Sequence, residues 1–325
     1  MTSKVELFES LPKITASVRR EIQKKVVGQD AVIEQMLLAL FSGGHCLFVG
    51  VPGLAKTLMV NSLAESMGLE FKRIQFTPDL MPSDIVGAEI LEEDKETGRR
   101  SLKFAKGPVF TNMLLADEIN RTPPKTQAAL LEAMQEKQVT TLGTTHTLPK
   151  PFLVFATQNP VEQEGTYPLP EAALDRFMFS VLVEYPSQAE EIAIIKRVIG
   201  TSMEAITSVL DTETLQNIQE VIKEVPLSDT LLQKITTLVA LTRGGEKAPK
   251  SVQQYVRYGA GTRASIYLSI AARTKAALRG AETPTWEDVL AIAKPVLRHR
   301  VMVNFQAEAQ GITSDDIIDE LVKQL

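Results

Sequence analysis

The amino-acid sequence predicts an α/β core followed by an all-helical domain. Through the first half of the chain, short apolar runs alternate with helical patterns, an order that is typical of a doubly wound parallel sheet. From Pro186 onward the strand-like runs stop and helical patterns take over. At 325 residues the chain is also too long for one small domain. We therefore expect a core over residues 1–185 and a helical domain over residues 186–325.

Five short runs are the expected strands of the core sheet. Most are apolar nearly throughout, as in parallel strands buried on both faces, and one alternates. They cover residues 46–49, 71–76, 113–116, 153–156 and 179–183. Apolar residues at helical spacing predict one helix around residues 32–40 and another over 58–67, where Gly68 is the expected C-terminal cap.

Two hairpins are expected to project from this sheet. Residues 87–107 hold the polar stretch EEDKETGRR between two apolar segments, which is a hairpin pattern. Residues 139–148 hold Gly143 inside a Thr-rich run and predict a second hairpin.

Helix signals mark the second domain. Ser187 and Glu190 form a capping-box pattern, and Ser228 precedes another apolar repeat at helical spacing. Two more helices are expected, over residues 262–279 and from 285 to about 298. Pro295 should kink or break the last of these because proline cannot donate the helical hydrogen bond.

Composition excludes several classes of protein. With 44% hydrophobic and 23% charged residues and a net charge of −5, the chain is neither collagen-like nor largely disordered. Its longest uncharged stretch falls short of the roughly 20 apolar residues of a membrane span, and its start lacks a secretory pattern, so we expect a cytoplasmic protein. One cysteine and three scattered histidines exclude an internal disulfide and a zinc site, so any metal should be held by oxygen.

Charge is unevenly distributed along the chain. Residues 250–300 hold nine Lys or Arg against three acidic residues, a balance of +6, which leaves −11 for the rest. Such a segment suits nucleic acid, a phosphate ligand or an acidic neighbouring subunit, or it is simply a set of solvated basic helix faces.

The segment GVPGLAKT at residues 50–57 has the context of a phosphate-binding loop, because it lies between an apolar strand and an amphipathic helix. Its glycines let backbone N–H groups point at phosphates, Lys56 would reach the β and γ oxygens, and Thr57 would ligate Mg²⁺. Ala55 replaces the usual glycine before the lysine, and we expect it to adopt helical angles. The expected nucleotide-binding residues are Gly50, Pro52, Gly53, Leu54, Ala55, Lys56, Thr57 and Leu58.

Polar residues follow two of the predicted strands. The run MLLADE delivers Asp117 and Glu118 to the carboxyl end of a strand, where parallel sheets place ligand chemistry. We expect Asp117 to hold Mg²⁺ and Glu118 to orient or deprotonate the attacking water. Asn159 follows the next strand and is the candidate for sensing the γ-phosphate, although alone it also fits a turn before Pro160.

Two arginines are candidates for stabilising transition-state charge. Arg176 precedes the last strand, where it can project into the nucleotide site of a neighbouring subunit; the alternative is a local ion pair with Asp175 or Glu171. Arg263 falls in the first turn of the helix at 262, where a cation opposes the helix dipole, so an anionic partner such as a nucleotide phosphate is expected.

Together these segments resemble an AAA+ ATPase, and more narrowly the MoxR family. The resemblance runs from Val27 to about Arg300 and includes RIQFTPDLMPSDIVG from Arg73, the long LLADEINR segment, ATQNPVEQEGTYPLPEAALDRF from Ala156, and VLRHR from Val296. In this family Ala55 is the usual residue. The stretch GAGTRAS departs from the more common Ser-Pro before the arginine, and Thr262 is expected to cap the helix instead.

The resemblance implies a P-loop AAA+ core with a helical lid, and it implies roles for particular positions. The roles are Walker A at residues 50–57, Walker B at Asp117 and Glu118, sensor 1 at Asn159, an arginine finger at Arg176, sensor 2 at Arg263, and adenine contacts from Val27 and Gly28. The two hairpins resemble the helix 2 insert and the pre-sensor 1 hairpin of this AAA+ branch. The implied cofactors are ATP and Mg²⁺.

The function that the resemblance implies is ATP hydrolysis in a ring, most simply a hexamer, that remodels or activates partner proteins in a chaperone-like way. Proteins with von Willebrand factor A domains are the implied partners. The alternatives are an AAA+ subunit of a metal-chelatase-like machine, a nucleic-acid-associated ATP switch based on the +6 segment, and a scaffolding ring without turnover. The Asp117 and Glu118 pair argues against the last, and few aromatic residues lie within the basic segment, so nucleic acid is not favoured.

Overall fold

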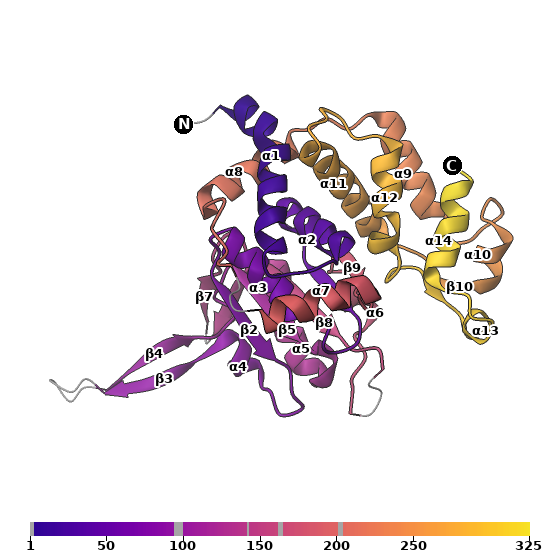
Figure 1. Ribbon diagram of the computed structural model, residues 1–325. Coiled ribbons are helices and arrows are strands. Elements are labelled where there is room, and N and C mark those ends of the chain that lie inside the picture. Colours follow the sequence, from indigo (N-terminus) through magenta and orange to yellow (C-terminus); the bar gives the residue numbers. More distant parts are fainter. Residues whose placement is uncertain (1–2, 94–99, 142, 162–164, 201–203) are drawn as a thin grey trace.

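The fold is built on a five-stranded parallel sheet. The computed structural model describes residues 3–93, 100–141, 143–161, 165–200 and 204–325. The strands are β1 (Cys46–Val49), β2 (Phe71–Gln75), β5 (Met113–Asp117), β8 (Leu153–Gln158) and β9 (Phe179–Leu182). They lie in the order β2-β5-β8-β1-β9 with parallel pairing throughout. The predicted doubly wound sheet and its five strands are therefore confirmed (Figure 1).

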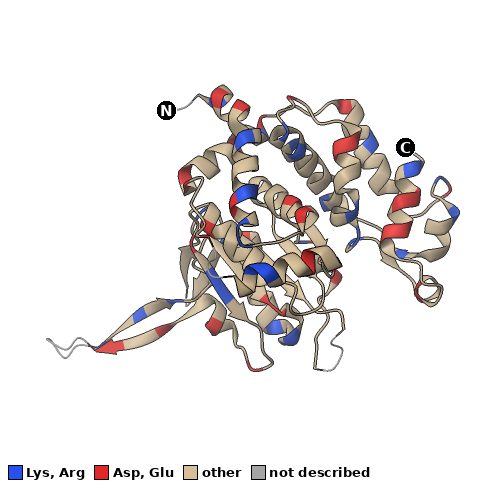
Figure 2. Ribbon diagram, in the orientation of Figure 1, with Lys and Arg blue, Asp and Glu red and all other residues tan. Residues whose placement is uncertain are grey.

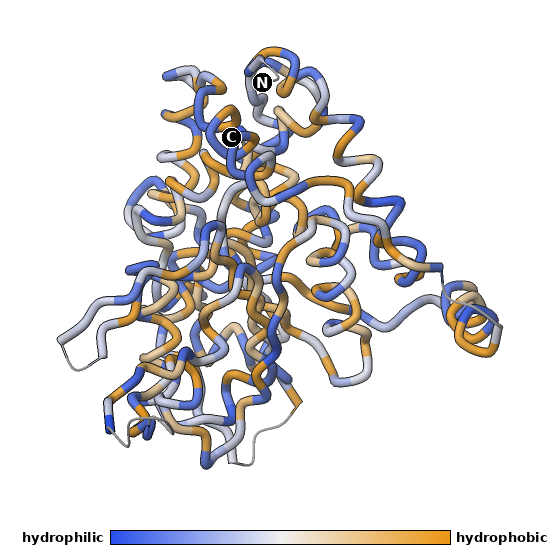
Figure 3. The backbone as a smooth tube through the Cα atoms, turned by 90° about the vertical axis from the view of Figure 1, so that its left-hand side faces the viewer, coloured by the Kyte–Doolittle hydropathy of each residue, from blue (hydrophilic) through white to orange (hydrophobic). Residues whose placement is uncertain are grey.

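Both faces of the sheet are buried, which explains the continuous apolar runs. On β5, Met113 and Leu115 belong to one hydrophobic cluster, whereas Leu114 and Ala116 belong to another. Alternate residues of a strand point to opposite faces, so one cluster lies on each side of the sheet. The covering helices are α2 (Asp30–Ser42), α3 (Lys56–Ser66), α4 (Pro82–Val86), α5 (Pro124–Glu136) and the short α6 (Glu171–Leu174). Figure 3 shows hydrophobic residues gathered inside the molecule.

The two predicted hairpins are present. The first pairs β3 (Gly87–Glu93) with β4 (Arg100–Lys106) and extends away from the sheet (Figure 1). Residues 94–99, the middle of its predicted polar tip, are not among the described residues. The second pairs β6 (Gln138–Thr141) with β7 (Thr144–Thr147). The rings of Phe104 and His146 stack with their centroids 4.1 Å apart, so the bases of the two hairpins are in contact.

The second half of the chain is the predicted helical domain. Its helices are α7 (Gln188–Ile199), α8 (Thr212–Lys223), α9 (Asp229–Leu241), α10 (Lys250–Tyr255), α11 (Thr262–Leu278), α12 (Trp286–Leu297), α13 (Phe305–Ala309) and α14 (Ser314–Lys323). A short antiparallel pair, β10 (Val256–Tyr258) with β11 (Met302–Val303), is added to them. Ser187 and Glu190 form the predicted capping box. The expected break at Pro295 is absent, because the proline lies in the last turn of α12 and few helical bonds follow it.

One long helix was not predicted. The helix α1 (Lys4–Gln23) precedes the core and packs against α3, α8 and α11, so it joins the sheet domain to the lid. Its start carries a readable signal, since Ser3 and Glu6 form a capping box. Within the described residues, the helices are all too short or too polar to cross a membrane.

The basic segment at 250–300 is largely neutralised inside the molecule. Six of its nine cations form ion pairs, five with carboxylates outside the segment and one with Asp288 inside it. These cations are Arg263, Lys275, Arg279, Lys294, Arg298 and Arg300. Figure 2 shows the result, with basic and acidic residues interspersed over the lid helices. The segment therefore stabilises contacts within the chain and is not a free basic surface.

Candidate nucleotide-binding site

The loop between β1 and α3 has a shape that depends on small residues. A Cβ on Gly50 would lie 2.5 Å from the carbonyl oxygen of Val183, so only glycine fits there. Gly53 has a φ of +85°, in the left-handed region that favours glycine. Ala55 precedes the first residue of α3 with φ +56° and ψ +21°, so our expectation that it adopts helical angles is wrong. Left-handed angles cost a non-glycine residue about 1–2 kcal/mol, and here they turn the chain into the helix.

Lys56 lies inside the turn that this loop makes. Its Nζ donates to the carbonyl oxygen of Gly50 at 2.5 Å, so the side chain reaches back to the first residue of the loop. Burial lowers the pKa of Lys56, while the nearby carboxylates of Asp117 and Glu118 act in the opposite direction. The first N–H groups of α3 have no partner within the helix and, with the helix dipole, favour an anion. A half-buried cation beside free N–H groups is the arrangement that holds phosphate.

Asp117 ends β5 in a network that sequence reasoning missed. Its Oδ2 accepts hydrogen bonds from Arg73 Nε at 3.1 Å and Nη2 at 2.6 Å, and its Oδ1 accepts one from Thr157 Oγ1 at 2.6 Å. Arg73 lies on β2, beside β5 in the sheet. The signal was a charged residue within an otherwise strand-like run, but its partner is 44 residues away in the sequence. A carboxylate fixed on both oxygens is held in one orientation.

Glu118 follows β5 directly and lines the same cavity as Asp117. Its backbone is in the left-handed region, with φ +57° and ψ +49°, which is uncommon for glutamate and is found where function fixes a side chain. Gln75 Nε2 at 2.7 Å and Arg121 Nη1 at 2.9 Å both donate to Glu118 Oε2. Its own N–H donates to Thr157 Oγ1, so one threonine links the two acidic residues.

The predicted phosphate, metal and sensor residues line one cavity of about 530 Å³, except Gly50, which lies at the start of the loop against Val183 and does not line it. Asn159 is 6% exposed within it, and its Oδ1 also accepts the N–H of Val161 at 3.1 Å. Asn159 therefore forms the turn and also lines the cavity, and its role as a sensor of the γ-phosphate stays a prediction. The other lining residues are Pro52, Gly53, Leu54, Ala55, Lys56, Thr57, Leu58, Arg73, Gln75, Asp117, Glu118 and Thr157.

A smaller and more apolar cavity of about 140 Å³ adjoins the first. The two share Gly53, Leu54, Ala55 and Leu58. Val27 lines the smaller cavity, whereas Gly28, the other predicted adenine contact, does not and has φ +68° beside it in the chain. The helix α7 closes the cavity with apolar side chains of Ile194 and Val198. An apolar pocket beside a phosphate loop suits a planar base.

The site also suits a magnesium ion held partly by phosphate. The hydroxyl of Thr57 and the carboxylate of Asp117 are oxygen ligands on one cavity wall, and Mg²⁺ is commonly bound by one or two protein oxygens together with substrate phosphates and water. Among the described residues, His, Cys, Asp and Glu form no cluster of three that would hold a metal without a phosphate.

Arg176 and Arg263 do not join this cavity. They line a different one of about 280 Å³, together with Gly44, His45 and Lys137. Gly44 and His45 precede β1, and the phosphate loop follows it, so the two cavities lie at opposite ends of a four-residue strand. At about 3.3 Å per residue this separates them by roughly 13 Å along the strand. Burial lowers the pKa of Lys137 to about 8.

The alternatives for the two arginines can now be distinguished. Arg176 does not pair with Asp175 or Glu171; its Nε donates to Gln135 Oε1 and its Nη1 to the carbonyl oxygen of Ala172. Arg263 has the expected anionic partner, but this is Asp175, with Nη1 at 3.0 Å from Oδ2. Gly261, rather than Thr262, precedes α11 as its N-cap, and it offers no side-chain cap.

Comparison with known proteins gives a consistent result. The family profile named ATPase family associated with various cellular activities (AAA) matches residues 45–179, and that of the AAA lid domain matches residues 249–321. The chain is 43% identical to Chaperone MoxR1 of Mycobacterium tuberculosis over 93% of this chain and 79% of that protein. Protein MoxR of Methylorubrum extorquens is 32% identical, over 89% of this chain and 87% of that protein. A crystal structure from Cytophaga hutchinsonii has a TM-score of 0.91 and 43% identity, and the match covers 98% of this chain and 96% of that one.

Proposed function

This chain belongs to the MoxR family of AAA+ ATPases, and from this premise we propose that it hydrolyses ATP with Mg²⁺ in a ring, most simply a hexamer. The ring would remodel or activate partner proteins in a chaperone-like way. The observation that supports hydrolysis best is that Lys56, Asp117, Glu118 and Asn159 line one cavity beside an apolar pocket.

The residues of this cavity divide the chemistry among them. Lys56 and the first turn of α3 bind the phosphates, and Thr57 and Asp117 would hold Mg²⁺, which neutralises phosphate charge when it is bound. Glu118 takes the proton of the attacking water or orients it, because its carboxylate lines the same cavity and is held there by Gln75 and Arg121. Asn159 supplies a polar contact to the water or to the γ-phosphate.

Two features support assembly. Arg176 and Arg263 lie at the amino edge of the sheet, where they cannot serve the phosphate loop of their own subunit without a large movement, so we assign Arg176 to the site of a neighbour. The helix α7 also has an apolar face that the described residues leave exposed. Ile192, Ile195, Val198 and Ile199 are 47%, 49%, 63% and 78% exposed, next to the proposed adenine pocket. Exposed apolar patches of this kind mark protein interfaces.

The partner is proposed from relatives. Chaperone MoxR1 suggests a protein client, and within that proposal we favour proteins with von Willebrand factor A domains. Ion pairing of six cations in the 250–300 segment removes the best support for a nucleic-acid function. A metal-chelatase-like machine would use the same ATPase site and would differ only in its client.

The test of hydrolysis compares three variants. In Glu118→Gln the general base is lost, so turnover should fall about 100-fold or more while a fluorescent ATP analogue still binds. Lys56→Ala should lose analogue binding as well, because its cavity then has no central cation. Glu220→Gln, on an exposed helix face away from the cavity, is the control and should behave as wild type. Wild-type phosphate release by Glu118→Gln would show that the base is assigned wrongly.

A further inference from the structure

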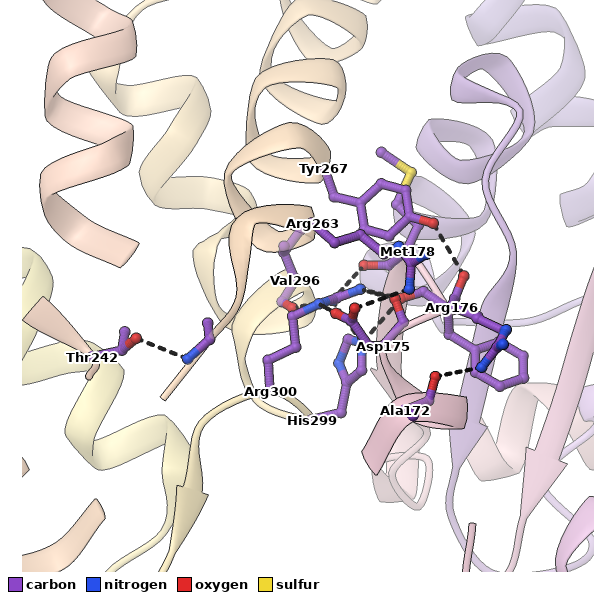
Figure 4. Close-up of polar contacts among 12 residues, drawn as sticks. Ala172, Asp175, Arg176, Met178, Thr242, Arg263, Tyr267, Val296, His299 and Arg300 are labelled. Atoms are coloured by element: carbon purple, nitrogen blue, oxygen red, sulfur yellow. Dashed lines mark hydrogen bonds and ion pairs between the residues drawn. The ribbon is translucent and has the colours of Figure 1, made fainter. Parts of the chain in front are cut away.

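The segment that carries Arg176 is bound along its backbone by the lid. Four consecutive carbonyl oxygens, those of residues 175 to 178, each accept a hydrogen bond from a lid side chain (Figure 4). The bonds are Arg300 Nη2 to Asp175 O at 2.8 Å, Tyr267 Oη to Arg176 O at 3.1 Å, Arg300 Nη2 to Phe177 O at 2.6 Å, and Arg300 Nη1 to Met178 O at 3.3 Å.

Arg300 is buried at the centre of this contact. It is 5% exposed, its Nε also donates to Asp175 Oδ1 at 2.8 Å, and its guanidinium lies 5.0 Å from the centroid of the Tyr267 ring. Burial lowers the pKa of Arg300, and the carboxylate of Asp175 opposes that shift. A planar guanidinium offers five donors in a fixed fork, so lysine cannot replace the whole set.

The side chain of Arg176 depends on this support. Its two hydrogen bonds go to a neutral amide and a backbone carbonyl, and within the described part of the chain no carboxylate forms an ion pair with it. Asp175, the adjacent acidic residue, is occupied by Arg263 and Arg300 from the lid. We therefore expect the guanidinium of Arg176 to shift when the backbone of residues 175–178 shifts.

We propose that Tyr267 and Arg300 are positioning residues for Arg176, so that the lid of one subunit sets the rate at the nucleotide site of the next. The proposal rests on the proposed role of Arg176 in a neighbouring site. A catalytic group displaced by about 1 Å can cost 10²-fold in rate, so modest changes in these bonds should be measurable.

The first experiment changes the two lid residues one at a time and compares each with a control variant in the lid. Tyr267→Phe loses only the bond to Arg176 O and keeps the ring beside Arg300, so kcat should fall about tenfold while KM for ATP and Tm stay near wild type. Tyr255→Phe loses a hydroxyl that bonds Gln310 within the lid and should be unaffected. Arg300→Lys should lower kcat further, with Arg298→Lys as its control. Wild-type kcat in both Tyr267→Phe and a folded Arg300→Lys would overturn the proposal.

The second experiment separates positioning from general weakening of the subunit. Subunits with Glu118→Gln cannot turn over themselves but can supply Arg176 to a wild-type neighbour. Mixed with wild type, Glu118→Gln with Tyr267→Phe should give lower activity than Glu118→Gln alone; equal activity would overturn the proposal. If Arg176→Ala itself kept wild-type turnover, the arginine finger would be wrong instead, so the two failures are distinguishable.

Discussion

Both edges of the central sheet carry arginines and carboxylates, but the two edges arrange these charged residues differently. At the carboxyl edge, Lys56, Asp117 and Glu118 share one cavity, and Arg73 pairs with a carboxylate inside it. At the amino edge, Arg263 and Arg300 neutralise one carboxylate, Asp175, while Arg176 projects into a cavity without an ion-pair partner among the described residues. Under the proposed function, the carboxyl edge contains the reacting groups, and the amino edge contains a cation that would act in the site of a neighbouring subunit.

In the proposed ring, this difference divides one site between two subunits. The carboxyl edge is shaped by local sequence, since each group follows a strand or starts a helix. The amino edge is shaped by the lid, whose side chains bind the backbone of residues 175–178. A change at the first edge should affect a subunit's own chemistry, and a change at the second should affect its neighbour's.

The largest effect at the amino edge is expected from Arg176→Ala. Turnover should fall about 10³-fold, the lower end of what an arginine finger contributes, because transition-state charge then lacks a cation. Binding of an ATP analogue to the same subunit should not change, since Arg176 is outside the phosphate cavity. Phosphate release and analogue titration on one preparation measure both. Loss of binding in this variant would place Arg176 in its own site and remove the distinction between the edges.

A smaller effect is expected from Arg73→Gln at the carboxyl edge. The variant leaves Asp117 Oδ2 without its guanidinium, and groups that orient a metal ligand typically contribute 10–100-fold. We expect about a tenfold change in the Mg²⁺ concentration that gives half-maximal activity. Lys72→Gln, on the same strand, is the matched control. An unchanged Mg²⁺ titration would show that Arg73 does not orient the metal ligand.

The smallest effect concerns stability in acid, and it is expected from two buried histidines near the amino edge, His45 and His299. Burial lowers the pKa of His45 well below its usual value, with Lys137 adding to the shift, and burial with Arg300 does the same for His299. Both stay neutral when folded but bind a proton when unfolded below about pH 6.5, so the free energy of unfolding falls on acidification. Each contributes about 1.4 kcal/mol per pH unit there.

Thermal unfolding between pH 7.5 and 5.5 checks this sign. The stability of the wild type should fall with acid, and the slope for His45→Gln should be shallower whatever its absolute Tm. An identical slope in the variant would mean that His45 does not stay neutral in the folded protein.

Much of the fold and the carboxyl edge could be predicted from sequence because the signals are local. Four apolar runs and one alternating run predicted the strands, and polar residues after two of them, such as Asp117 and Asn159, predicted part of the cavity wall. The angles of Ala55 were not predictable in this way, because alanine is a good helix former and only the loop around it imposes left-handed angles. The helix α1 was missed although its capping box was readable.

The amino edge could not be predicted because its contacts join distant parts of the chain. Arg300 binds Asp175 from 125 residues away, and Arg263 does so from 88. The excess charge of residues 250–300 indicated an anionic partner, and the structure shows that carboxylates of this chain supply it for six of the nine cations. A charge count identifies the sign of a partner but not whether it lies in the same subunit.

Mixing two inactive variants tests the division of the site between subunits most directly. Lys56→Ala subunits cannot bind ATP but keep Arg176, whereas Arg176→Ala subunits keep the phosphate cavity but lack the finger. Phosphate release measured across mixing ratios should pass through a maximum near equal proportions, because each Lys56→Ala subunit can then serve an Arg176→Ala neighbour. Activity that stays at the level of the separate variants at every ratio, in rings shown to contain both, would contradict the account.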